Sequence, residues 1–180
     1  MPAYMLGSKK PRIHPTAVLA PNSTIIGDVV IGPRTSIWPG AVIRGDYGYI
    51  RIGSDCSIQD NVVIHCSAEN PTIIGDGVTV AHSAVVHACR VGDECLIGVG
   101  AIIFDGARIG KHSILGVGST VLGGAMIPPR SVAVGAPAKI IRRAADKDVR
   151  LIKESYRAYV EMGRRYATLG VYKKPVFLGD

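Results

Sequence analysis

Large aliphatic residues recur at every sixth position along most of this chain, from about residue 13 to 135. The longest regular runs are Leu19, Ile25, Ile31, Ile37 and Ile43, and later Val91, Ile97, Ile103, Ile109, Leu115, Val121 and Ile127. A small or β-branched residue stands two positions before each of them, as with Ala17 and Ser113. A period of six is not helical, but it suits short strands with one inward aliphatic side chain each. The pattern predicts an all-β parallel β-helix in which three hexads form one triangular coil.

The repeat has two interruptions between Ile43 and Val91. A loop is expected at residues 66–72, and one residue is missing from the spacing between Val80 and Val91. Irregularities in repeated β-structure often redirect a side chain. We therefore expect these two places to bear on function.

After the turn at residues 135–139 the apolar period becomes helical, from about Asp146. The predicted inward stripe is Val149, Ile152, Tyr156, Tyr159 and Gly163. Asp146 is the expected N-cap and Gly170 the expected end of the helix. We expect residues 1–140 to form the β-helix with a short N-terminal lead-in. Residues 141–180 would form a helix and tail that pack on the prism, either their own or a neighbour's.

Composition limits the alternatives. The 180 residues fit a single domain, and they include neither a recognisable signal peptide nor a membrane-length apolar stretch. The four cysteines lack CxxC spacing, which favours reduced thiols in a cytoplasmic protein. Much of the net charge of +7 comes from residues 142–174. Without interleaved aromatic residues we interpret this segment as a solvated helix face, and we expect neither a nucleic-acid nor a membrane partner.

The register assigns positions to three of the five histidines. Outward side chains that follow the aliphatic residues of the second prism face form one column of Arg44, His65 and His87. His82 falls on the first face, where Gln59 and Asp60 are its neighbours. Histidines one coil apart can share a metal ion, but the third cannot easily reach it. A threefold trimer that sets the second face of one subunit against the first face of the next would supply it.

Three histidine ligands with an open position indicate a catalytic rather than a structural zinc site. The alternative is that these histidines are surface side chains without partners. Cys66, which follows His65, is a weaker candidate ligand. Arg44, Asp46 and Asp60 are expected either to form ion pairs across the subunit contact or to orient the ligands. Gln59 is expected to hold a metal-bound water or substrate.

The segments Arg44-Gly45-Asp46 and Gln59-Asp60-Asn61, followed by His65, His82 and His87, resemble the signature of the γ-class carbonic anhydrase family. The likeness covers almost the whole chain, including the turn at residues 135–139. The family belongs to the hexapeptide-repeat superfamily, so the resemblance implies a left-handed β-helix and a homotrimer. It also implies three zinc or iron sites between subunits, with the three histidines as ligands.

The same resemblance implies further roles. Gln59 would lie near the metal-bound solvent, Arg44 would form intersubunit salt bridges with Asp46 and Asp60, and Tyr159 would approach the site. The implied reaction is reversible hydration of CO2 to bicarbonate by a metal-bound hydroxide at the trimer interface. The chain departs from the archaeal prototype at two places, because the loop after His65 is short, with Glu69 as its one acidic residue, and Tyr47 replaces an acidic residue. The proton shuttle is therefore left open.

Two other functions remain at this stage. One is a hexapeptide-repeat acyltransferase that uses CoA, in which a single histidine acts as general base. The other is a trimeric metal-binding or scaffold protein with little catalysis. The sequence does not choose among Zn2+, Fe2+ and Co2+, since neutral imidazole suits all three.

Overall fold

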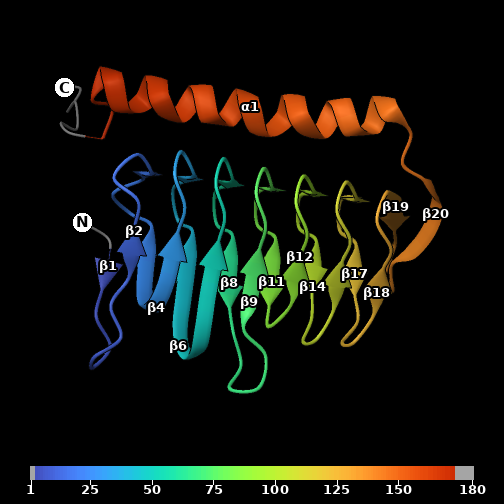
Figure 1. The fold of residues 1–180 in the computed structure, drawn as a ribbon, viewed down its shortest axis with the longest axis horizontal. Coiled ribbons are helices and arrows are strands. Elements are labelled where there is room, and N and C mark those ends of the chain that lie inside the picture. Colours follow the sequence, from blue (N-terminus) through green and yellow to red (C-terminus); the bar gives the residue numbers. More distant parts are fainter. Residues whose placement is uncertain (1–2, 173–180) are drawn as a thin grey trace, which may run out of the picture.

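The protein is a three-sided prism of stacked coils with one long helix along its side, as seen in a computed structural model that describes residues 3–172 (Figure 1). Parallel strands of successive coils pair along each side. The first face contains β3 (Val18–Leu19), β5 (Ser36–Ile37), β7 (Ser57–Ile58), β10 (Thr79–Val80), β13 (Leu96–Ile97), β16 (Ile114–Leu115) and β19 (Ser131–Val134), and ends on the antiparallel β20 (Lys139–Arg143).

Two long strands, β4 (Thr24–Ile31) and β6 (Val42–Ile52), bend round the corner between the second and third faces. The second face is completed by β1 (Ala3–Tyr4), β8 (Val63–His65), β11 (Val85–His87), β14 (Ile102–Ile103) and β17 (Thr120–Val121). The third face is completed by β2 (Arg12–Ile13), β9 (Thr72–Ile74), β12 (Arg90–Val91), β15 (Arg108–Ile109) and β18 (Met126–Ile127). The predicted fold class, a parallel β-helix with a C-terminal helix, is confirmed.

The hexad aliphatic residues form the core. Ile43, Ile64 and Val86 are next to one another in parallel strands, and all three are fully buried. Their successors point outward, so every strand contributes one side chain to the interior and the next to the surface. This alternation fixes the column in which each surface residue lies.

The corners are tight, and most of them contain one residue with a left-handed backbone. Asn61 and Ser83 have φ values of 59° at the corner between the first and second faces. At Gly27, where φ is 81°, a Cβ atom would overlap the backbone of Gly45 in the next coil. The missing residue after Val80 is absorbed at another corner, directly after β11, where Ala88 has a φ of 49°.

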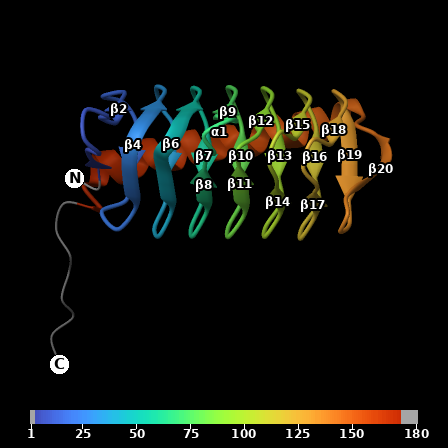
Figure 2. The ribbon, with the colours of Figure 1, turned by 90° about the horizontal axis from the view of Figure 1, so that it is seen from below.

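Helix α1 (Asp146–Leu169) lies along the first face of its own chain, in contact with β3, β5, β7 and β10 (Figure 2). Ile152 and Gly163 are buried on its inner side, as the stripe predicts. A neighbouring subunit that approaches the strands in contact with α1 would therefore also meet the helix. The expected contact between the first face of one subunit and the second face of the next stays a prediction.

The helix ends at Gly170, as predicted, with φ at 64°. It begins one residue earlier than predicted, because the N-cap is Ala145 and Asp146 is already helical. The Asp148 carboxylate accepts the Ala145 N–H at 2.7 Å and also binds Arg142. No helix within residues 3–172 is both long and apolar enough to span a membrane.

Candidate metal centre

Three predicted site residues lie in one column on neighbouring strands. Arg44 of β6 pairs in register with His65 of β8, which pairs with His87 of β11. Neighbouring strands in a sheet are about 4.8 Å apart, and the two imidazole rings have centroids 5.1 Å apart. The repeat thus brings two of the three histidines together within one chain.

The nitrogen atoms of this pair are arranged in an unusual way. Nδ1 of His65 lies 3.0 Å from Nε2 of His87. The opposite nitrogens each meet a carboxylate: Nε2 of His65 is 2.8 Å from Asp46, and Nδ1 of His87 is 2.6 Å from Asp105. A carboxylate only accepts hydrogen bonds, and a neutral imidazole has one N–H and one lone pair. With both N–H groups held at the outside, two lone pairs face each other across the gap.

Facing lone pairs repel unless a positive ion is shared between them. Two nitrogen ligands of a tetrahedral zinc ion, at bond lengths of about 2.0–2.1 Å, are about 3.3 Å apart. The observed separation of 3.0 Å is close to that value. The donor set therefore fits a metal ion that binds imidazole.

His82 is not part of this pair. It lies at the corner that follows β10, and its Nδ1 is 2.9 Å from a carboxylate oxygen of Asp60. Its backbone N–H donates to the buried Gln59 side chain at 3.3 Å. Within residues 3–172 of one chain, no three His, Cys, Asp or Glu side chains are grouped so that they could hold a metal ion.

Asp46 connects Arg44 to His65. Burial alone would raise the pKa of Asp46, but hydrogen bonds from His65, the Tyr47 N–H and Arg44 outweigh it and lower the pKa to about 2. Arg44 forms its ion pair with Asp46 of the same chain, whereas Asp60 pairs with His82. The Tyr47 ring lies 6.2 Å from that of His65 and is largely exposed.

Tyr159 reaches the same corner from α1. Its ring packs edge-on against Trp38 with centroids 5.6 Å apart. Burial raises the pKa of Tyr159, and the negative charge of Asp60 raises it further. The helix thus brings the phenol to the side of the prism where Asp60 and His82 lie.

Cys66 does not contribute a ligand in this arrangement. Its side chain is buried and its Sγ accepts the Gly48 N–H at 3.3 Å. Burial raises the pKa of the thiol, which disfavours the thiolate that a metal requires.

Sequence reasoning missed Asp105. It lies eighteen residues after His87, one more than the seventeen-residue coil that sets Phe104 next to His87. That spacing was available in the sequence as a signal, but only the carboxylates near Arg44 and Gln59 were considered.

Exposed apolar side chains continue the two histidine columns. Beyond His87, the next outward positions are Phe104 and Leu122, with Phe104 45% exposed. Beyond His82, the matching corner positions are Val99 and Val117, with Val117 77% exposed. Contiguous apolar surface of this kind marks an interaction site.

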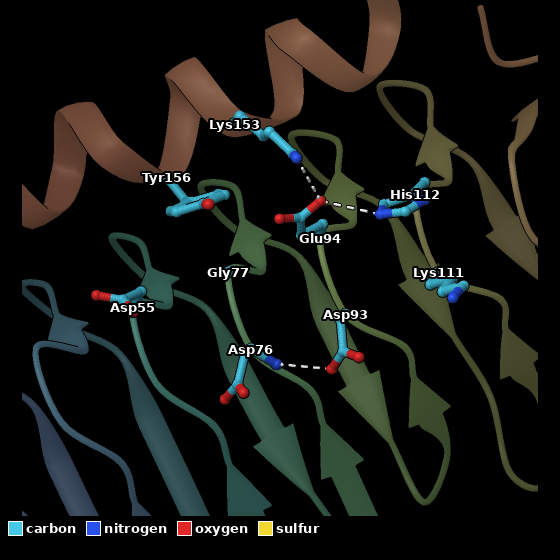
Figure 3. Close-up of a pocket in the computed structure, with 9 residues that line it drawn as sticks. All are labelled: Asp55, Asp76, Gly77, Asp93, Glu94, Lys111, His112, Lys153 and Tyr156. Carbon is cyan, nitrogen blue, oxygen red and sulfur yellow. Dashed lines mark hydrogen bonds and ion pairs between the residues drawn. The ribbon is translucent and has the colours of Figure 1, made fainter. Parts of the chain in front are cut away.

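A hollow of about 420 Å³ lies away from the histidines, at the corner between the third and first faces (Figure 3). Its acidic side chains already have structural partners. Asp76 accepts the Ser54 N–H at 2.6 Å, and Asp93 accepts the Asp76 N–H at 3.0 Å. Glu94 binds His112 at 2.9 Å and Lys153 of α1 at 3.4 Å, which fastens the helix to the prism.

Comparison with known proteins identifies the family. Residues 10–45 match the family model "Bacterial transferase hexapeptide (six repeats)". A carbonic anhydrase of Geobacillus kaustophilus is 49% identical over 92% of this chain and 91% of its own length. Gamma carbonic anhydrase 2 of Arabidopsis thaliana is 40% identical over 89% of this chain, which spans 60% of that protein. The chain belongs to the γ-class carbonic anhydrase family. The resemblance drawn from the sequence is thereby confirmed, and so is the expectation that the chain is an enzyme.

Other relatives of this carbonic anhydrase family member have different names. The carnitine operon protein CaiE of Escherichia coli is 33% identical over 94% of this chain and 87% of its own length. A Bacillus cereus structure labelled as an acetyltransferase is 41% identical, with a TM-score of 0.91 over 93% of this chain and 97% of its own. Membership of the family therefore leaves the reaction to be argued from the site.

Proposed function

We propose that this chain catalyses the reversible hydration of CO2 to bicarbonate at a metal centre shared between two subunits of a homotrimer. The observation that carries the proposal is the pair of His65 and His87. Their facing nitrogens are 3.0 Å apart, and carboxylates hold the opposite nitrogens. Imidazole ligands whose second nitrogen meets a carboxylate are typical of metal sites.

The chemistry of the ligands sets the class of metal. Three neutral imidazoles suit Zn2+, and they suit Fe2+ and Co2+ as well. When bound, such an ion acts as a Lewis acid that brings the ionisation of water into the neutral pH range. We take Zn2+ as the proposed cofactor, with Fe2+ and Co2+ as alternatives.

The third ligand, His82, comes from the neighbouring subunit in this proposal. His82 lies apart from the pair within its own chain, with Asp60 on its Nδ1, so its Nε2 is available to a partner. Two apolar columns extend from the two ligand positions, one through Phe104 and the other through Val117. A threefold axis brings such columns together, because each subunit then presents one column to each neighbour.

The remaining predicted residues have roles that do not require them to bind the metal. Asp46 and Asp60 hold His65 and His82 in orientation, and Arg44 neutralises Asp46. Gln59 holds the His82 backbone through its oxygen, which leaves its amide NH2 group to donate to solvent or to bicarbonate. Tyr159 closes the same corner from the helix side.

Metal analysis combined with a CO2 hydration assay tests the proposal. Purified protein should contain one metal ion per chain, and stopped-flow measurements should show hydration that stops on chelation. His82→Ala should lose both metal and activity, although His65 and His87 remain. His112→Ala removes an ion pair with Glu94 at the corner between the third and first faces, so it serves as the control and should retain both.

The same preparation distinguishes the rival functions. Full metal occupancy in His82→Ala would contradict the shared centre. Acyl transfer from acetyl-CoA by metal-free protein would instead support the acyltransferase that the Bacillus cereus label suggests. Stoichiometric metal without any hydration would favour a binding or scaffold role.

A further inference from the structure

We infer that Asp105 is a positioning residue that fixes the ring orientation and tautomer of His87, so that Nε2 faces His65. The inference rests in part on the proposed function, because Nε2 is the nitrogen assigned there to the metal. Its geometric basis is the contact of 2.6 Å between Oδ1 of Asp105 and Nδ1 of His87.

The backbone around Asp105 is held by the coils on both sides. The Gly106 N–H donates to the Ala88 carbonyl at 2.8 Å, and the Asp105 carbonyl accepts the Gly124 N–H at 2.8 Å. Asp105 therefore projects from a corner that is tied to the coil of His87 and to the next one. A carboxylate held in this way can hold its partner ring in one orientation.

The shortened corner beside His87 contributes to the contact. The spacing from Val86 to Val91 is five residues instead of six, and Ala88 takes up the difference with a φ of 49°. This corner directly follows His87 and directly neighbours the corner that contains Asp105. The irregularity in the repeat thus lies at the place where the two side chains meet.

Hydrogen bonding then decides which nitrogen carries the lone pair. The carboxylate accepts a hydrogen bond and donates none, so in a neutral imidazole Nδ1 of His87 must be the N–H and Nε2 the acceptor. Among residues 3–172, His87 Nδ1 has no hydrogen-bond partner other than Asp105. Without that carboxylate the ring is free to rotate and to place its proton on Nε2.

Asp105 differs from the corner carboxylates Asp76 and Asp93. Asp76 and Asp93 each accept a backbone N–H from an adjoining coil, so their removal would loosen the fold. The Asp105 side chain is 46% exposed, and its one hydrogen bond within the described residues is to His87. Its replacement should therefore affect His87 without unfolding the prism.

The first experiment measures the tautomer of His87 in metal-free protein, by long-range 1H–15N NMR with 15N-labelled histidine. The wild type should show His87 protonated on Nδ1. Asp105→Asn keeps an acceptor oxygen and should retain this tautomer, whereas Asp105→Leu should shift His87 to a population dominated by Nε2–H. An unchanged Nδ1–H signal in Asp105→Leu would overturn the inference.

The second experiment measures zinc affinity by competition with a chelator. Loss of a carboxylate that orients a histidine ligand weakens metal binding by about 10–100-fold, and this is the expected effect of Asp105→Leu, with Asp105→Asn intermediate. Asp28→Leu removes a carboxylate that pairs with Arg51 on the third face, and it should bind zinc as the wild type does. Equal affinity of Asp105→Leu and wild type would also overturn the inference.

The two experiments separate the inference from the proposed function. If the His87 tautomer depends on Asp105 while the wild-type trimer binds no metal, the positioning role stands and the metal centre fails. If zinc binds tightly and the tautomer ignores Asp105, the metal centre stands and the positioning role fails.

Discussion

Phe104→Ser should weaken assembly of the proposed trimer without unfolding the chain. Phe104 is the outward residue one coil beyond His87, in the column assigned to the subunit contact, and 45% of its surface is exposed in a single chain. An aromatic side chain buries about 150–250 Å² when fully covered, so about 90 Å² is available to a neighbour. At about 25 cal/mol per Å², covering it contributes about 2 kcal/mol at each contact.

A cyclic trimer has this contact three times, so the substitution should remove about 6 kcal/mol from the free energy of assembly. Since about 1.4 kcal/mol corresponds to a factor of ten, the trimer association constant should fall about 10⁴-fold. For a monomer–trimer equilibrium this raises the midpoint concentration by about 100-fold. Analytical ultracentrifugation over a dilution series, in mild urea if the trimer does not otherwise dissociate, gives that midpoint.

Met126→Ser is the matched control. Met126 is 71% exposed, but it lies on the third face, away from both histidine columns. Its replacement should leave the midpoint unchanged. If Phe104→Ser assembles as tightly as the wild type and as Met126→Ser, the assignment of this column to the subunit contact is refuted.

Three further predictions concern the stability of the fold. The hydrogen bond from Arg142 is the main cause that lowers the pKa of Asp148 to about 2. The stabilisation from this ion pair is present at neutral pH and is lost as pH falls towards 2. Circular-dichroism melts should therefore show Asp148→Asn less stable than wild type at pH 7, with no difference near pH 2. Gly163 of α1 has room for a Cβ atom at ordinary contact distance from the first face. Gly163→Ala should therefore raise the free energy of unfolding by up to about 1 kcal/mol, whereas Gly163→Leu should lower it by about 1–3 kcal/mol. The reverse order of stability in chemical denaturation would contradict this packing. Gly27 and Gly118 both have positive φ, but only at Gly27 would a Cβ atom meet backbone; thermal melts should therefore show Gly27→Ala far more destabilised than Gly118→Ala, and equal losses would refute the steric argument.

The coil and its columns could be predicted from the sequence because the period acts directly on geometry. One inward aliphatic residue per strand fixes which neighbour points outward, and the register of Ile43 with Ile64 follows from counting hexads. The pairing of His65 with His87 then needed only the loop and the missing residue to be placed correctly.

Other features depend on contacts that a one-dimensional pattern does not contain. The apolar stripe of α1 predicts that one side of the helix is buried, but it does not say against which face of the prism. The structure shows that it packs on the first face of its own chain. The N-cap was misassigned because Ala145 has no capping side chain, and the helix start is held by Asp148 from inside the first turn. Asp105 was missed because it lies one position beyond Phe104, which is the residue that continues the column of His87.

Subunit mixing tests the central claim most directly. Chains with His82→Ala retain the histidine pair, and chains with both His65→Ala and His87→Ala retain only His82. Neither should bind metal as a pure trimer. In mixed trimers of either composition one interface regains all three histidines, so the account predicts one metal ion per mixed trimer by elemental analysis. Metal in either parent trimer, or none in purified mixed trimers, would contradict a centre shared between subunits.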